Sequence, residues 1–220
     1  SPAAFDLQGI NEETLIDFTP ELRQEALEIV SEFDHGGLYT PPSLKGAIAL
    51  PGWTGGAEWS GAAFDPETSM YYIPSVTNPI VIQLVENNPS ETEFAYRRDG
   101  VRTISGPQGL PLTKPPYGRI SAVNLDTGDY EWVRPNAEGI RQRIIDLGID
   151  DPGPVGIPIV APLLVTKTLL FQAITDGVPL LRAMDKTTGE TIAEIELPGI
   201  PQGAPMTYML DGKQYIAISC

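Results

Sequence analysis

The chain has 220 residues, enough for one domain with a sizeable core, and its 22 glycines and 22 prolines favour many short strands joined by turns. Its 29 acidic and 14 basic side chains give a net charge of −15, which repels phosphate backbones and argues against nucleic acid as a partner. The single cysteine, Cys220, excludes an intrachain disulfide and a thiol-rich metal site.

The first predicted element is a short helical arm that occupies residues 1–38. Asn11 can cap a short helical turn, and Thr19 can cap a longer helix over residues 20–33, in which apolar side chains recur at helical spacing. We expect this arm to cover the sheets rather than to form their core. No apolar run reaches the roughly 18 residues of a membrane span.

From residue 39 onward, short apolar runs alternate with turn residues, which is typical of a protein rich in β-sheet. The predicted strands cover residues 47–50, 61–64, 70–74, 119–124, 130–133, 163–165, 169–173, 181–185, 191–197, 204–210 and 213–219. Two long connections, at about 77–116 and 134–162, separate groups of strands. Connections of this length are either functional or disordered, and we expect both to lie at one rim of the fold.

An internal repeat links three of the predicted hairpins. Residues 63–69, 122–128 and 183–189 each hold a strand end, then Asp or Asn, then a turn closed by Thr-Gly or Thr-Ser, and they start 59 and 61 residues apart. Asp or Asn can bond back to the turn backbone, and glycine tolerates the positive φ at which the chain reverses. A period of about 60 residues fits a four-stranded propeller blade with long loops.

The repeat predicts an all-β fold: a partial β-propeller of about three four-stranded blades over residues 39–220, preceded by the helical arm. Propellers close with typically four to eight blades, so about three blades leave sheet faces uncovered. We therefore expect the remainder of a propeller, or self-association through open blade edges, to complete the ring.

Several segments, taken together, resemble the quinoprotein glucose and alcohol dehydrogenases, which depend on pyrroloquinoline quinone. The matching segments are residues 40–46, 55–66, 112–120, 203–208 and 211–215. Their order is that of the C-terminal part of the family's eight-bladed propeller. The family also has Ala-x-Asp-x-x-Thr-Gly-x-x-x-Trp, in which Trp docks between blades; residues 122–132 are the best copy, with Asn124 in place of Asp and Trp132 as the docking residue.

The resemblance implies a cofactor, a metal and a location. Family members bind pyrroloquinoline quinone with a divalent ion, usually calcium, and transfer hydride from a sugar or alcohol hydroxyl to the quinone. They are typically periplasmic. Their catalytic base and metal ligands normally lie in earlier segments than those matched here. We therefore expect no catalytic residue and no metal ligand in this chain, which would then be an inactive fragment. Whether it binds the cofactor by itself is left open by the resemblance.

The resemblance also implies three candidate cofactor-binding residues. The family's Gly-Gly-x-Asn-Trp element corresponds to residues 55–59, so Gly56, Glu58 and Trp59 are candidates. Glu58 stands where the family has Asn, and its carboxylate would be repelled by the carboxylates of the quinone unless a cation lies between them. Glu58 can equally be a solvated surface acid, and Trp59 can be a packing residue.

For three other polar residues the sequence supports only weaker functional hypotheses. His35, the single histidine, follows the predicted helix, where a cation is favourable, and no second histidine lies nearby to complete a metal site. Lys114 and Arg119 flank a Pro-Pro-Tyr-Gly turn and either line the channel mouth or are solvated.

Two alternatives to a dehydrogenase fragment remain open. The first is a non-catalytic propeller scaffold or interaction module, which Glu58 favours. The second is a small complete domain that closes its ring by self-association.

Overall fold

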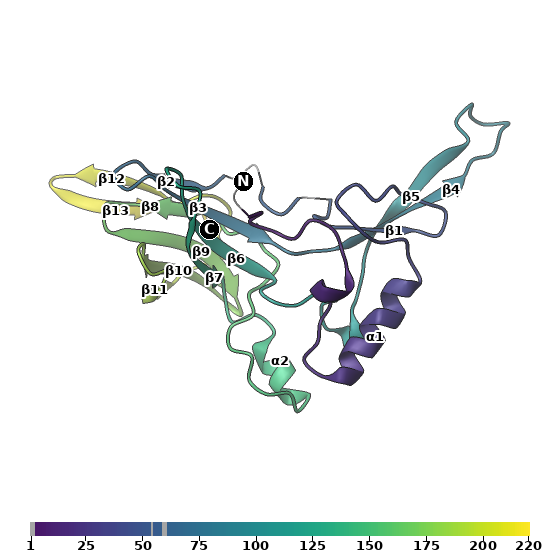
Figure 1. Cartoon of the computed structure of the whole chain (residues 1–220). Coiled ribbons are helices and arrows are strands. Elements are labelled where there is room, and N and C mark those ends of the chain that lie inside the picture. The colour runs from purple at the N-terminus through teal and green to yellow at the C-terminus, as the bar shows by residue number, and fades with distance from the viewer. Residues whose placement is uncertain (1–2, 54, 59–60) are drawn as a thin grey trace.

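The computed structural model describes residues 3–53, 55–58 and 61–220, and it is built mainly of antiparallel β-sheets (Figure 1). The helices are the 3₁₀ turns η1 (Glu12–Thr14) and η2 (Pro107–Gly109) and the α-helices α1 (Pro20–Ser31) and α2 (Arg141–Asp146). The strands are β1 (Ala47–Ala49), β2 (Ala63–Asp65), β3 (Met70–Val76), β4 (Ile80–Glu86), β5 (Tyr96–Thr103), β6 (Gly118–Asn124), β7 (Tyr130–Pro135), β8 (Leu163–Val165), β9 (Leu169–Asp176), β10 (Val178–Asp185), β11 (Thr191–Glu196), β12 (Met206–Leu210) and β13 (Lys213–Ala217).

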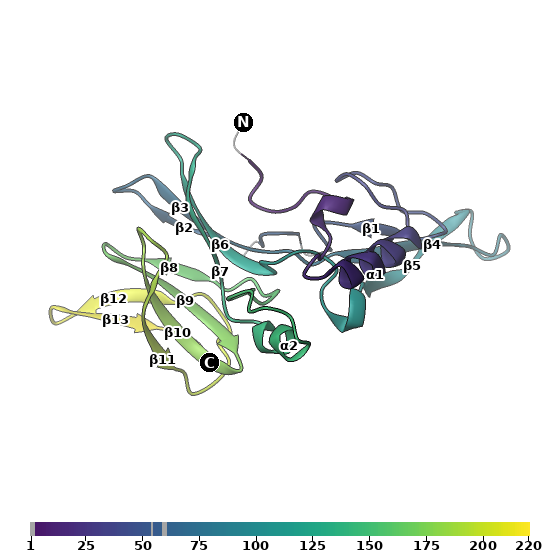
Figure 2. The ribbon, with the colours of Figure 1, turned by 60° about the horizontal axis from the view of Figure 1, so that its bottom comes forward.

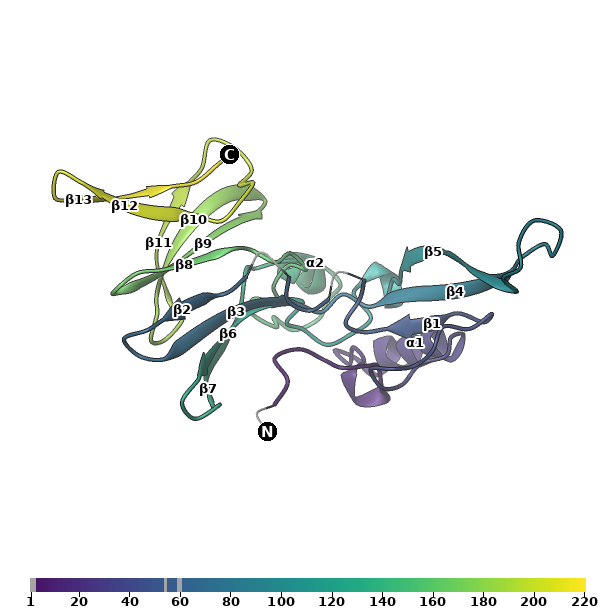
Figure 3. The same cartoon turned by 90° about the horizontal axis from the view of Figure 1, so that it is seen from above.

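Two four-stranded antiparallel sheets form complete blades. The first has the strand order β2-β3-β6-β7, and the second is the consecutive meander β8-β9-β10-β11. Figures 2 and 3 show the two sheets side by side, with β2 of the first close to β8 of the second. β12 and β13 follow as a two-stranded hairpin. The partial propeller is therefore confirmed, although the third unit has two strands in the described residues and not four.

The three repeated hairpins have the predicted turn chemistry. Asp65 Oδ1 accepts the N–H of residue 67 at 3.1 Å, Asn124 Oδ1 accepts that of residue 126 at 2.9 Å, and Asp185 Oδ1 accepts that of residue 187 at 2.7 Å. The residues that close the turns have positive φ: Ser69 at 56°, Gly128 at 79° and Gly189 at 72°. Each copy therefore reverses the chain by the same local interactions. The expectation of one copy per blade is wrong, because the β2–β3 and β6–β7 turns belong to the same sheet and the third turn belongs to the next one.

Trp132 holds the two blades together. Its indole Nε1–H donates to the carbonyl oxygen of Lys186, in the turn of the second blade, at 3.2 Å, and its ring centroid lies 5.8 Å from that of Tyr72. Tyr72 donates its hydroxyl to the same carbonyl at 3.1 Å. The Lys186 ammonium also pairs with Asp65 of the first blade at 2.5 Å, and both side chains are buried. The docking predicted for Trp132 is confirmed.

The N-terminal arm belongs to the largest of the hydrophobic clusters in the described chain. α1 starts at the predicted Thr19 cap, whose hydroxyl accepts the Leu22 N–H at 3.2 Å. Its buried face packs with β1, η2 and α2 in a cluster formed by Ile10, Leu15, Ile16, Leu22, Ala26, Val30, Ile48, Leu50, Val81, Leu110, Leu112, Tyr117, Ile144 and Val155. The expectation that the arm only covers other elements is wrong, because it supplies six of these 14 residues.

The connection between β3 and β6 contains a β-hairpin for which the sequence predicts no strand. β4 is the central strand of a three-stranded sheet and pairs with β1 on one side and β5 on the other, and the β4–β5 hairpin projects away from the blades (Figure 1). The division into residues 1–38 and 39–220 stays a prediction. No helix in the described part of the chain is long and apolar enough to cross a membrane.

Candidate functional site

Gly56 and Glu58 lie in the 51–61 loop, which leads into β2 and of which the structure describes residues 51–53, 55–58 and 61. Gly55 has φ of 81° and donates its N–H to the Gly52 carbonyl at 3.0 Å, so the loop turns sharply there. The Gly56 carbonyl accepts the N–H of Val76, the last residue of β3, at 2.7 Å. The Glu58 carbonyl accepts the Gly61 N–H at 3.1 Å. The loop is therefore tied to the first blade through its backbone.

The three candidates differ in their surroundings. Gly56 is buried, and Glu58 is exposed. Trp59 lies outside the described residues. A Cβ added to Gly56 would overlap the carboxylate of Asp6, so the missing side chain leaves room for that carboxylate.

A buried polar cluster of Asp6, Thr77 and Arg119 lies directly against this glycine. Asp6 Oδ1 accepts three hydrogen bonds, from the Leu7 N–H at 2.7 Å, the Thr77 hydroxyl at 2.8 Å and the Arg119 guanidinium at 3.2 Å. The Asp6 and Arg119 side chains are only 3% and 10% exposed. The guanidinium also donates to the Thr77 hydroxyl oxygen. The cluster joins the N-terminal arm to β6 and to the end of β3.

Burial perturbs both charged members of the cluster. Desolvation raises the pKa of Asp6, and the charge of Arg119 and the hydrogen bonds to Oδ1 oppose this shift. Desolvation likewise lowers the pKa of Arg119, and the Asp6 carboxylate opposes it. Asp6 Oδ2 and Arg119 Nε are buried without a hydrogen-bond partner among the described residues. Each charge therefore depends on the other for most of its stabilisation.

The remaining polar candidates are dispersed. Arg119 is paired with Asp6, so it is neither solvated nor a channel-facing cation. Lys114 forms a half-exposed ion pair with Asp17 at 2.6 Å. His35 is exposed, with Nδ1 3.2 Å from the Phe33 carbonyl oxygen. The described residues contain no group of three or more His, Cys, Asp or Glu side chains that could hold a metal ion.

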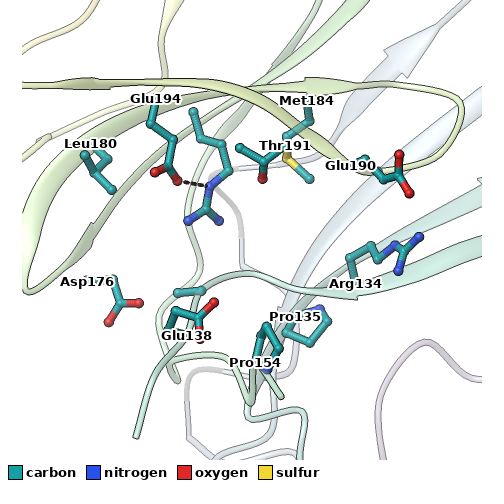
Figure 4. A pocket seen from close by; sticks show the side chains of 13 residues that line it. Arg134, Pro135, Glu138, Pro154, Asp176, Leu180, Met184, Glu190, Thr191 and Glu194 are labelled. Atoms are coloured by element: carbon teal, nitrogen blue, oxygen red, sulfur yellow. Dashed lines mark hydrogen bonds and ion pairs between the residues drawn. The ribbon is translucent and has the colours of Figure 1, made fainter. Parts of the chain in front are cut away.

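A cavity of about 580 Å³ lies elsewhere, between β7 and the β10–β11 hairpin (Figure 4). Its walls carry charges of both signs, and on one wall Arg182 Nε of β10 pairs at 2.8 Å with Glu194, its cross-strand neighbour on β11. Arg182 also donates to the Asn136 carbonyl at 2.6 Å. Its guanidinium therefore stabilises the fold, and no described residue of the 51–61 loop lines this cavity.

Sequence reasoning did not identify Asp6 as a neighbour of the candidate site. Asp6 and Arg119 are 113 residues apart, and neither belongs to a repeated motif. The one available signal was the pair of adjacent glycines at 55 and 56, because a glycine without positive φ, such as Gly56, often marks a close approach by another group.

Comparison with known families matches residues 1–216 to the pyrroloquinoline quinone (PQQ) family described as glucose/ethanol/alcohol dehydrogenase, β-propeller domain. The chain belongs to this PQQ family. The match covers both blades, the 51–61 loop and the N-terminal arm, which agrees with the sheet architecture.

Relatives with established names are larger members of the PQQ family. The chain is 29% identical over 201 residues to quinoprotein glucose dehydrogenase A of Acinetobacter calcoaceticus, covering 84% of this chain and 25% of the relative. It is 31% identical over 206 residues to the probable quinate dehydrogenase (quinone) of Xanthomonas campestris pv. juglandis, covering 83% and 26%. The chain therefore spans about a quarter of the length of these relatives.

A solved structure supports the fold alone. The europium-containing methanol dehydrogenase superposes with a TM-score of 0.53 at 22% sequence identity, over 78% of this chain and 26% of that chain. The fold of this PQQ-family chain thus matches about a quarter of a larger chain.

Proposed function

We propose that this chain is part of a PQQ-dependent dehydrogenase that oxidises a hydroxyl group of a sugar or an alcohol. The observation that carries the proposal is the family match over residues 1–216, together with two blades joined by Trp132. Bound PQQ would accept the hydride, while a carboxylate accepts the hydroxyl proton. Relatives named for glucose and for quinate support a polyhydroxylated or alcoholic substrate.

The 51–61 loop is the part of the chain that we assign to the cofactor. Gly56 would hold the loop backbone close to the blade, Glu58 would present its carboxylate, and Trp59 would contact the cofactor. Glu58 is exposed, and no ion pair to it occurs among the described residues. PQQ carries carboxylates, so Glu58 fits the site only if a divalent cation, which we propose to be calcium, lies between them.

We propose that the chain supplies only some of the residues that surround the cofactor. No described group of side chains can hold the cation alone, and we assign the catalytic base to residues outside this chain. By itself the chain would then be inactive. If it lies in the periplasm, as we propose for the whole protein, its acidic composition is compatible with that location.

Exposed apolar side chains on the last hairpin support the proposal that the remainder of a propeller is the partner of this chain. On the β12–β13 hairpin, Met206, Met209 and Leu210 are 57%, 65% and 53% exposed. Isolated two-stranded hairpins are marginally stable, so we propose that further strands cover this one. Self-association through the same surface is the competing arrangement.

A non-catalytic scaffold is the second candidate function. The observation that favours it is Glu58, which introduces a negative charge where the family's Asn is neutral. In that case the blades would be kept for packing or for partner binding, and the loop would bind no cofactor.

A dye-linked dehydrogenase assay tests the proposal. The chain alone and the chain joined to the preceding residues of its natural precursor are supplied with PQQ and calcium, then with glucose, quinate or ethanol. We expect activity only for the longer protein, and a large loss in Glu58→Gln. Glu67→Gln, an exposed acid in the β2–β3 turn, is the control and should keep activity. An inactive longer protein that binds no PQQ would establish the scaffold function instead.

A further inference from the structure

A segment of the N-terminal arm holds the 51–61 loop at two points. The Gly9 N–H donates to the carbonyl of Leu50, immediately before the loop, at 2.8 Å. Three residues earlier, the Asp6 carboxylate lies against Gly56, where no Cβ would fit. Residues 6–9 therefore run alongside the part of the loop that precedes Glu58.

Asp6 is held firmly enough to act as a fixed support. All three of its hydrogen bonds go to Oδ1, whereas Oδ2 is the oxygen that lies against Gly56. One of the three donors, Thr77, follows Val76, which donates its N–H to the Gly56 carbonyl. The contacts thus close a ring that runs through Asp6, Thr77, Val76 and Gly56, and this ring includes the loop at Gly56.

We propose that Asp6 is a positioning residue that sets the path of the 51–61 loop, and through it the place of Glu58. The proposal rests on the proposed function only in its final step, since the loop contacts are independent of any cofactor. Arg119 pairs with the buried carboxyl group of Asp6, and the glycine at 56 lets that group approach the backbone. The N-terminal arm thereby becomes part of the site's framework rather than a separate cover.

A buried ion pair that only stabilises the fold would behave differently. Breaking it would weaken the whole blade, as for any buried pair that loses one partner. A positioning residue instead controls the local opening of the loop. The matched control is a second ion pair with little exposure, Asp65 with Lys186, whose side chains are 5% and 11% exposed and which joins the end of β2 to the β10–β11 turn of the second blade.

Amide hydrogen exchange, followed by NMR on the full chain, separates the two roles. The reporters are the N–H groups of Gly55, Gly61 and Val76, each of which is bonded within or to the loop. In Asp6→Asn we expect these amides to exchange about tenfold faster, while the amides of β9 and β10 keep their rates. Asp65→Asn should not reproduce this pattern. Equal acceleration in both variants, or none in Asp6→Asn, would overturn the proposal.

Gly56→Ala keeps the test decisive if Asp6→Asn unfolds. It places a methyl group against the Asp6 side chain, so it should accelerate exchange at the same three amides. A double-mutant cycle extends the test: in an Asp6→Gly background every Asp6 side-chain atom that the methyl group would meet is absent, and adding Gly56→Ala should then change the exchange rates less than twofold. Additive effects would show that Asp6 and Gly56 do not act on each other, and would contradict the proposal.

PQQ binding separates this proposal from the proposed function. If wild type binds PQQ with calcium, the dissociation constant should rise about tenfold in Asp6→Asn and stay within twofold in Asp65→Asn. If wild type binds no PQQ but the exchange pattern holds, the proposed function fails while the positioning role of Asp6 stands. An unchanged exchange pattern overturns the positioning role whatever the binding result.

Discussion

Replacing Trp132 tests whether the two blades depend on one docked side chain. The side chain is 9% exposed, and its indole N–H is bonded to the Lys186 carbonyl at 3.2 Å. A buried tryptophan removes about 150 to 250 Å² from water, which at about 25 cal/mol per Å² sets an upper bound of about 4 to 6 kcal/mol. Tryptophan-to-alanine changes in cores typically cost about 3 to 5 kcal/mol.

We therefore expect Trp132→Ala to lower the free energy of unfolding by about 4 kcal/mol. Domains are stable by only about 5 to 15 kcal/mol, so this loss is a large part of the total. Trp132→Phe keeps an aromatic ring beside Tyr72 but removes the hydrogen bond, and should cost about 1 to 2 kcal/mol. Urea unfolding followed by far-ultraviolet circular dichroism measures both, because it does not depend on tryptophan fluorescence.

Trp53 provides the control for this experiment. It is 65% exposed, and its ring lies 4.5 Å from the Arg98 guanidinium, an arrangement worth about 0.5 to 1 kcal/mol at exposed sites. Trp53→Ala should therefore cost less than about 1 kcal/mol. Similar losses for Trp132→Ala and Trp53→Ala would refute the conclusion that Trp132 joins the blades.

Two further changes test a turn and an ion pair. In urea unfolding, Gly189→Ala should destabilise the chain by about 1 to 2 kcal/mol more than Gly177→Ala. Both glycines have positive φ, but only a Cβ at position 189 would lie 2.8 Å from the Trp132 ring. Equal losses of stability would contradict that contact. The hydrogen bonds from Arg141 lower the pKa of Asp151 to about 2, so this pair stabilises the fold above pH 4 and loses its effect as the pH falls towards 2. In Arg141→Gln, an NMR titration should show the pKa of Asp151 raised towards its ordinary value of 3.8, with the Gly153 N–H still lowering it, and an unchanged pKa would show that the pair does not form in solution.

Local chemistry explains which elements were predictable. In each turn the Asp or Asn side chain accepts a hydrogen bond from the backbone N–H two residues later, so the interaction is local. The three hairpins could therefore be predicted from residues 65, 124 and 185. The α1 start depends on one hydroxyl and one proline, which are adjacent in the sequence. Trp132 was predictable only because its spacing resembles a known family pattern.

Non-local contacts explain what could not be predicted. The pair of Asp6 and Arg119 joins segments 113 residues apart, and its effect on Gly56 is visible only in three dimensions. β4 has an apolar start at residues 80–82, but β5 holds three arginines and a glycine and shows no alternation, so the hairpin did not stand out within its long connection. The helical arm contributes to a core because β1, η2 and α2 pack on it, which no local pattern indicates.

The measurement that tests the central claim most directly is an equilibrium titration of PQQ into the chain, with and without calcium, followed by quenching of tryptophan fluorescence. We predict saturable, calcium-dependent binding that is weakened at least tenfold in Glu58→Gln and unchanged in Glu67→Gln. Binding that depends on neither calcium nor Glu58, or no binding by the chain and by the longer protein to which we propose it belongs, would contradict the assignment of the 51–61 loop to the cofactor.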